Sequence, residues 1–208
     1  MSNLTDFFPS GGGGGLTPKF EEFNASGTFT PSQALIDAGG YIEVFLVGGG
    51  SGGFQDSTTA GGQGGEVQTI KMYLTNTNSV NVTIGAGGAR CLWNTIASGA
   101  GGQSVFNGSS AGGTTITSIG GIGWNGNSTE YRNTMLSPGF GAIMNSGYYS
   151  ASPGPGVNGY GMGGGLVSGI GSYTSAQKPN SGQGGVTGNN VSRSTEGASG
   201  YCLIKWYE

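Results

Sequence analysis

The chain has 208 residues, 48 of them glycine, and a formal net charge of −3 with 8% charged residues, so it lacks the high charge that keeps disordered chains soluble. It contains no histidine, which excludes histidine-based acid–base catalysis and histidine metal ligands, and its two cysteines, Cys91 and Cys202, are too few for a four-cysteine zinc site. The excess of acidic over basic residues argues against binding to nucleic-acid phosphates, and we expect no nucleic acid, metal or cofactor as a ligand.

Residues 1–24 are predicted to form an N-terminal attachment segment, and residues 25–208 a single domain. The segment begins with a short apolar hook, which consists of Leu4, Phe7, Phe8 and Pro9. The glycines of residues 11–15 would then act as a flexible joint. A hook ahead of a hinge suits docking on another protein, and the alternative is a terminus that packs on its own domain. The start of the chain lacks the features of a secretory signal and no apolar run approaches the ~20 residues of a bilayer span, so we expect synthesis in a cytosol and no membrane insertion.

From residue 26 onward, strand-like segments alternate with clusters of glycine. In chain order the predicted strands are residues 27–30, 41–47, 66–74, 79–84, 103–106, 114–119 and 200–207. Residues 41–47 give the strongest signal, and because only Glu43 interrupts their apolar run, we expect both faces of this strand to be covered. Residues 79–84 alternate between apolar and polar side chains, and the Asn-Thr-Asn turn before them predicts a hairpin with residues 66–74.

No segment of helical length shows a helical pattern, and glycine disfavours helix interiors by roughly 1 kcal/mol per residue. We therefore predict an all-β protein with a single, jelly-roll-like β-sandwich, because a closed sandwich hides its strand edges best. The glycine clusters would lie between the strands, in residues 48–53, 61–65, 85–88, 99–102, 120–123, 163–165 and 182–185.

These clusters are predicted to pack against one another at one end of the sandwich. Ordering glycine is entropically expensive. Extended segments in a polyproline-II-like conformation can nevertheless approach closely when they lack Cβ atoms, and they can then hydrogen-bond to each other. Such packing would give a rigid surface of loops, whereas the alternative is flexible loops in solvent.

Four of these pieces resemble, in the same order, the signatures of glycine-rich domains in bacteriophage tail fibres. They are residues 27–30 with the strand 41–47 running into glycine, the "VNVTIGAGG" of residues 80–88, the "GGQSVF" of residues 101–106 and the "GASGYCLIKW" of residues 197–206. The likeness covers roughly residues 26–207. The opening residues also resemble, more loosely, the start of small phage tail proteins.

The resemblance implies a tail-fibre or tail-tip protein that attaches to the virion by its N-terminal segment and recognises the host cell surface. The implied partners are other virion tail proteins and a host surface glycan or outer-membrane protein, and the implied location is the virion tail. Fibre components are often trimeric, so the resemblance also implies a homo-oligomer such as a trimer. One alternative is a purely structural head or tail decoration protein. The other is an enzyme that trims surface glycans, but without histidine or a paired acidic motif we expect no enzymatic activity.

Residues 124–179 combine aromatic side chains with serine, glycine and asparagine, which is the mixture that binding loops use. The candidate receptor-binding residues are Trp124, Tyr131, Arg132, Tyr148, Tyr149, Tyr160 and Tyr173. Their rings would stack on sugars, while the polar residues would meet hydroxyl groups. The alternative is that these aromatic residues pack the glycine loops, which lack side chains of their own. The G-x-G-x-x-G matches in the chain do not lie between a strand and a helix, which excludes dinucleotide binding.

Overall fold

The computed structural model describes residues 15–53, 62–90, 98–123, 160–161, 166–167, 179–185, 187–188 and 194–208. Within these residues the protein is all-β, as predicted, with two antiparallel four-stranded sheets. Among the described residues, helical structure is limited to the short helix α1 (Gln33–Asp37) and the 3-10 turn η2 (Gly108–Ala111). Two short strands, β8 (Leu166–Val167) and β9 (Thr187–Gly188), pair in parallel away from the main sheets. The described part has no helix that is long and apolar enough to cross a membrane.

The two sheets contain all of the predicted strands, and the ends of these strands agree with the prediction to within one residue. The first sheet has the order β1-β10-β3-β4, formed by β1 (Pro18–Phe23), β10 (Tyr201–Tyr207), β3 (Tyr41–Val47) and β4 (Val67–Tyr73). The second has the order β2-β5-β6-β7, formed by β2 (Gly27–Phe29), β5 (Val80–Thr83), β6 (Ser104–Asn107) and β7 (Thr115–Ser118).

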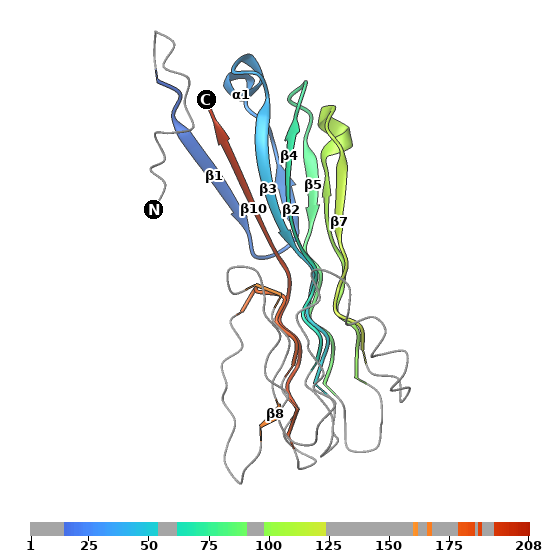
Figure 1. Ribbon diagram of the computed structural model, residues 1–208. Helices are drawn as coiled ribbons and strands as arrows, with labels where there is room; N and C mark the ends of the chain where they lie inside the picture. The colour runs from blue at the N-terminus through green and yellow to red at the C-terminus, as the bar shows by residue number, and fades with distance from the viewer. Residues whose placement is uncertain are drawn as a thin grey trace.

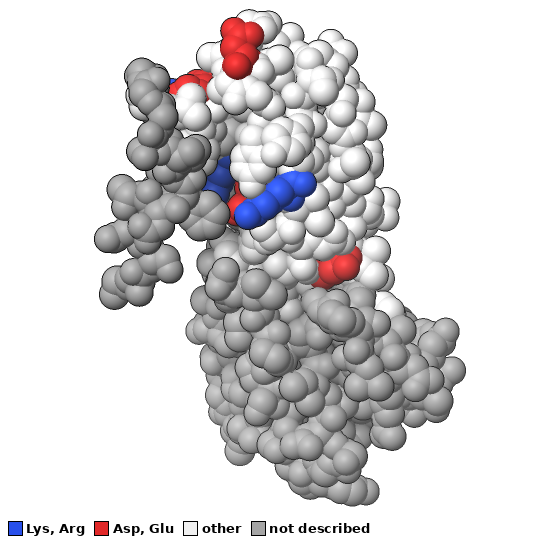
Figure 2. All heavy atoms as spheres, turned by 45° about the horizontal axis from the view of Figure 1, so that its top comes forward, with Lys and Arg blue, Asp and Glu red and all other residues white. Residues whose placement is uncertain are grey.

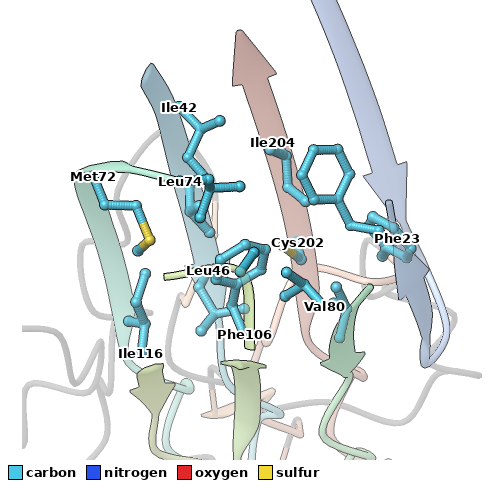
Figure 3. Close-up of a cluster of buried hydrophobic side chains, with 14 of the residues drawn as sticks. Phe23, Ile42, Leu46, Met72, Leu74, Val80, Phe106, Ile116, Cys202 and Ile204 are labelled. Carbon is cyan, nitrogen blue, oxygen red and sulfur yellow. The ribbon is translucent and has the colours of Figure 1, made fainter. Parts of the chain in front are cut away.

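The hydrophobic core lies between the two sheets, as Figure 3 shows for its labelled side chains. The first sheet contributes Ile42, Leu46, Met72, Cys202 and Ile204, among others, and the second contributes Phe29, Val80, Val82, Phe106 and Ile116. The alternation that predicted β5 is confirmed, because Val80 and Val82 are buried while Asn81 and Thr83 are exposed. Burying each large apolar side chain contributes roughly 1.5–3 kcal/mol, so this core is the main source of stability.

The outer face of β3 is only partly covered, which corrects the expectation that both of its faces are buried. Ile42, Val44 and Leu46 are fully buried, whereas Tyr41 and Glu43 are half-exposed. The Glu43 carboxylate lies 3.9 Å from Lys71 Nζ on β4, a partner that needs access to water. A single carboxylate in an apolar strand was therefore the signal for an open face.

The predicted hairpin between β4 and β5 is wrong. β4 pairs with β3, and β5 pairs with β2 and β6, so the two strands belong to different sheets. A turn does exist at residues 76–78, where the Asn78 N–H donates to Asn76 Oδ1 over 2.9 Å. It carries the chain from one sheet to the other because Leu74 and Val80 both have to face the core.

The N-terminal part of the described chain belongs structurally to the sandwich. β1 pairs along its whole length with β10, and the Phe23 side chain at its end is buried. β1 precedes the domain boundary that was predicted after residue 24, so residues 18–23 pack on their own domain. The predicted hook residues Leu4, Phe7, Phe8 and Pro9 lie outside the described residues.

Cys202 is a free, buried thiol, while Cys91 lies outside the described residues. Burial, and secondarily the nearby Glu21 carboxylate, raise the pKa of Cys202 to about 12. A thiol with this pKa stays protonated at neutral pH and has little nucleophilic character.

The raised pKa of Cys202 predicts a loss of stability at alkaline pH. Between pH about 9 and about 12 the unfolded chain releases the thiol proton while the folded chain keeps it, so the free energy of unfolding falls as pH rises. In a Cys91→Ser background, urea unfolding should show that the protein with Cys202 loses about 1 kcal/mol more than Cys202→Ala between about pH 8 and about pH 10. An identical pH dependence of the two proteins would contradict this environment for the thiol.

Candidate functional site

In the described part of the chain, seven glycine-rich segments run side by side beyond one end of the sandwich and form the glycine bundle (Figure 1). The central segment is residues 48–53, which directly continue β3. The six segments around it are residues 62–66, 85–90, 98–103, 119–123, 181–185 and 194–200. Most of them lead directly into or out of a strand of the sandwich, which fixes one end of each of these segments.

The central segment donates its backbone hydrogen bonds to three neighbours in strict rotation. Its N–H donors are Gly48, Gly49, Gly50, Ser51, Gly52 and Gly53, and the accepting carbonyls belong in turn to Glu66, Gly102, Ala198, Gln63, Gly99 and Thr195. The same neighbouring segment returns at every third residue, and all six bonds measure 2.8–3.0 Å. A period of three residues without bonds inside the segment is the geometry of a polyproline-II-type helix.

The carbonyl groups of the central segment bind the other three neighbours. Gly49, Gly50 and Ser51 accept hydrogen bonds of 2.7–2.8 Å from the N–H groups of Gly121, Gly88 and Gly185, respectively. Six segments therefore surround one, with donors and acceptors alternating around it. The predicted packing is confirmed for six of the predicted glycine clusters, whereas residues 163–165 lie outside the described residues. Segment 194–200 joins the bundle without having been predicted, and the interruptions by other residues do not prevent a regular arrangement.

The six outer segments also bind one another and close a ring. Gly62 and Gly65 donate to Gly185 and Gly182, Gly197 and Gly200 to Gly88 and Gly85, and Gly99 and Gly102 to Ala89 and Ala86. Further bonds run from Gly182 to Ser199, from Ala198 to Gln183, from Gly101 to Gly121 and from Glu66 to Ile119. Each neighbouring pair around the ring is thus joined through its backbone.

Glycine is required in the centre of the bundle because the neighbouring backbones approach too closely for a side chain. A Cβ on Gly50 would lie 2.0 Å from the carbonyl oxygen of Gln183, and one on Gly52 would lie 2.0 Å from that of Ala89. Neither glycine has a positive φ, so the constraint is space and not backbone conformation. The one other residue of the central segment is Ser51, which is fully buried and whose Oγ accepts the N–H of Gln63 at 2.7 Å.

In two outer segments, residues other than glycine occupy positions that face outward. Ala86 and Ala89 are exposed in segment 85–90, and Ala100 and Gln103 are exposed in segment 98–103. The spacing of three residues places them on the same side of a three-residue turn. A repeated G-G-x pattern in the sequence was therefore the signal for outer segments.

The bundle also fixes the places where the chain leaves it at the end away from the sandwich. The chain departs at Gly53, Arg90, Gly123 and Gly185, and it returns at Gly62, Ser98 and Ser194. The predicted receptor-binding residues Trp124, Tyr131, Arg132, Tyr148, Tyr149 and Tyr173 lie outside the described residues.

Tyr160 is the predicted receptor-binding residue that the structure describes. Its ring centroid lies 5.1 Å from that of Phe45 and 5.1 Å from that of Tyr201, on the outer face of the first sheet. Burial and a hydrogen bond with Glu22 raise the pKa of the Tyr201 hydroxyl beside it. Tyr160 thus packs on strand residues of the sandwich, whereas the alternative interpretation expected these aromatic residues to pack the glycine loops.

The described surface has few charges. Figure 2 shows isolated basic and acidic residues on one face, with no broad patch of a single sign in the coloured part. The ion pairs Glu43–Lys71 and Lys19–Glu208 are partly exposed. No group of three or more cysteine, aspartate or glutamate residues in the described ranges is placed to hold a metal ion.

A β-sandwich whose strands continue into a hydrogen-bonded bundle of glycine segments defines a glycine-rich structural domain. The family described as glycine-rich domain matches residues 24–207, and the chain belongs to this family. No curated protein matches the chain.

The close approach at Gly50 predicts that a single methyl group will disrupt the bundle. Gly50→Ala should lower the free energy of unfolding by about 2–3 kcal/mol, because the methyl group overlaps the Gln183 carbonyl and the backbones have to separate. Gly15→Ala is the matched control, since a Cβ there meets no atom within 4 Å. Urea unfolding measures both, and equal stability of the two variants would contradict the packing.

Proposed function

We propose that this protein is a component of a bacteriophage tail fibre or tail tip. In this proposal it attaches to the virion by its N-terminal segment and recognises the host cell surface through glycine- and aromatic-rich loops. One observation carries the proposal: the described chain ends lie at one end of the sandwich, and the glycine bundle extends from the opposite end (Figure 1).

The end of the sandwich that would face the virion is held together by contacts between the two chain ends. Thr17 and Glu208 exchange two backbone hydrogen bonds, of 2.6 and 3.1 Å. The Glu208 carboxylate also accepts from Ser32 Oγ and from Trp206 Nε1, and these bonds lower its pKa. An N-terminal attachment segment would therefore emerge from a firmly fixed point.

The opposite end supports recognition because the bundle holds the ends of the intervening chain segments in place. Binding segments whose ends are already ordered lose less conformational entropy on binding. Functional loops on a rigid β scaffold are a common arrangement in binding proteins. A surface with few charges suits a neutral glycan or the outer part of a membrane protein, and many copies on one virion would multiply weak single contacts.

A purely structural virion protein is the second candidate function, and the position of Tyr160 favours it. This aromatic residue stacks within its own domain, so the other aromatic residues of its region could serve packing as well. Both candidates need the N-terminal segment for attachment, but only the first needs accessible aromatic rings.

Binding to cells tests the first candidate. Fluorescently labelled full-length protein should bind to intact cells of the host bacterium. The double variant Tyr148→Ser/Tyr149→Ser should bind about tenfold less, a loss of about 1.4 kcal/mol. Tyr73→Ser is the matched control, because Tyr73 is 64% exposed on the sandwich, and it should bind normally. Equal binding of the double variant, or no binding of the parent protein to any host cell, would overturn recognition by these loops.

Incorporation into particles tests the attachment. A variant without residues 1–14 should bind cells like the full chain but should be missing from purified virions. Its normal incorporation would contradict attachment through the N-terminal segment, whichever of the two functions holds.

A further inference from the structure

The strand β1 forms an open edge of the first sheet (Figure 1). It pairs with β10 on one side, and no other described strand pairs with it. Thr17 and Glu208 exchange both of their backbone hydrogen bonds, so the alternation of an antiparallel ladder turns the backbone groups of Pro18, Phe20 and Glu22 away from β10. The N–H groups of Phe20 and Glu22 have no partner within the described residues. This edge therefore offers unpaired donors and acceptors to a further strand.

The side chains of β1 are suited to a further contact. Phe20 lies on the outer face of the sheet and is 70% exposed. Lys19 and Glu21 lie on the other face, where Lys19 Nζ is 3.7 Å from a carboxylate oxygen of Glu208 and its side chain is still 45% exposed. Glu21 forms no ion pair within the described residues, and burial raises the pKa of its carboxyl. The edge thus carries an apolar ring and a carboxylate that lacks a cation.

We propose that β1 pairs with β1 of a second copy of this chain, antiparallel and around a two-fold axis that passes beside Phe20. The two four-stranded sheets would then join into one continuous sheet. The two copies of Phe20 would exchange both of their backbone hydrogen bonds, and the Glu22 N–H of each copy would donate to the Pro18 carbonyl of the other. Because proline lacks an N–H, the Glu22 carbonyls would stay in contact with water. This inference does not rest on the proposed function.

The charges on β1 are complementary to those of a second β1 in this register. With Phe20 opposite Phe20, Lys19 of each copy lies opposite Glu21 of the other, in a pair without mutual hydrogen bonds whose side chains approach closely. Opposite charges at such positions are stabilising. A shift of two residues in one direction places Lys19 opposite Lys19, and the same shift in the other direction places Glu21 opposite Glu21, both of which are repulsive. The order of charges therefore selects one register.

The same register gives the exposed ring of Phe20 a partner, because the two rings meet on the outer face of the joined sheet. A matching strand needs an acidic residue opposite Lys19, a basic residue opposite Glu21 and an apolar residue between them. The reversed sequence of β1 supplies all three, which favours a second copy as the partner. Because the contact involves one six-residue strand from each copy, we expect a weak dimer that forms at high protein concentration.

Sedimentation velocity of the full-length protein tests the proposal. Between about 1 μM and about 1 mM the protein should shift from monomer towards dimer. Lys19→Glu and Glu21→Lys should each weaken the dimer about tenfold, because each places like charges opposite one another. An equimolar mixture of the two variants should restore dimer formation, because the acidic pair of one then meets the basic pair of the other. Arg90→Glu, at an exposed position of the glycine bundle, is the matched control for the change in charge and should dimerise normally.

Several results would overturn the proposal. One is a folded protein that stays monomeric over the whole range of concentrations. Another is a dimer that Lys19→Glu and Glu21→Lys leave unchanged, or that Arg90→Glu weakens equally, because the contact would then lie elsewhere. A mixture of the two folded variants that fails to restore the dimer would exclude this register. Slow hydrogen exchange of the Phe20 and Glu22 amides in the monomer would assign the edge to another segment of the same chain.

A second variant keeps the test decisive if the loss of the Lys19–Glu208 contact disturbs folding. Phe20→Asp changes an exposed side chain and leaves the pairing with β10 in place, because the backbone groups of this residue point away from β10. It places two carboxylates opposite each other on the axis, so it should also weaken the dimer about tenfold. Normal dimer formation by Phe20→Asp would contradict pairing through β1.

Discussion

The backbone hydrogen bonds of residues 48–53 hold six other segments of the chain around one axis. Each such bond contributes a net stabilisation of only about 1 kcal/mol, whereas ordering one residue costs roughly 1–2 kcal/mol, and glycine costs more than other residues. The bundle therefore has little stability of its own. It persists because the strands of a well-packed sandwich deliver its segments to fixed starting points, and because an unpaired buried N–H would cost about 1–3 kcal/mol.

This dependence makes the two parts of the domain one cooperative unit. The central segment continues β3, the strand that pairs with both β10 and β4 in the first sheet. Ser104 on β6 links the parts further, since its Oγ donates to the Val47 carbonyl and accepts from the Gly85 N–H. A substitution at Gly50 should consequently lower the free energy of global unfolding and should not act only through local unfolding of the bundle.

Seven of the eight strands in the two sheets could be predicted from the sequence, because alternation of side chains is a local property that Val80–Thr83 and Tyr201–Tyr207 show clearly. The strand β1 was missed, since its residues were assigned to the attachment segment. The pairing partners of the strands could not be predicted. The turn at residues 76–78 has the same sequence whether it joins two paired strands or connects two sheets, and only the packing of the shared core decides between these arrangements. The packing of glycine segments followed from their lack of Cβ atoms. Residues 48–53 occupy the centre of the bundle because of the topology of the chain, which the sequence does not reveal. One hint was present in the sequence, since this segment contains only glycine and Ser51. For the receptor-binding residues, Tyr160 shows the limit, since composition cannot tell a ring that stacks on Tyr201 from one that meets a sugar.

Native-state hydrogen exchange of the backbone amides tests the central claim most directly. The amides of Gly49, Gly50, Ser51, Gly52 and Gly53 all donate to neighbouring segments and should exchange as slowly as those in the core of β3, by global unfolding. Gly87 provides the internal control, because its N–H has no partner within the described residues and should exchange quickly. Exchange of residues 49–53 at the rate of Gly87, or of an unstructured peptide, would contradict the account.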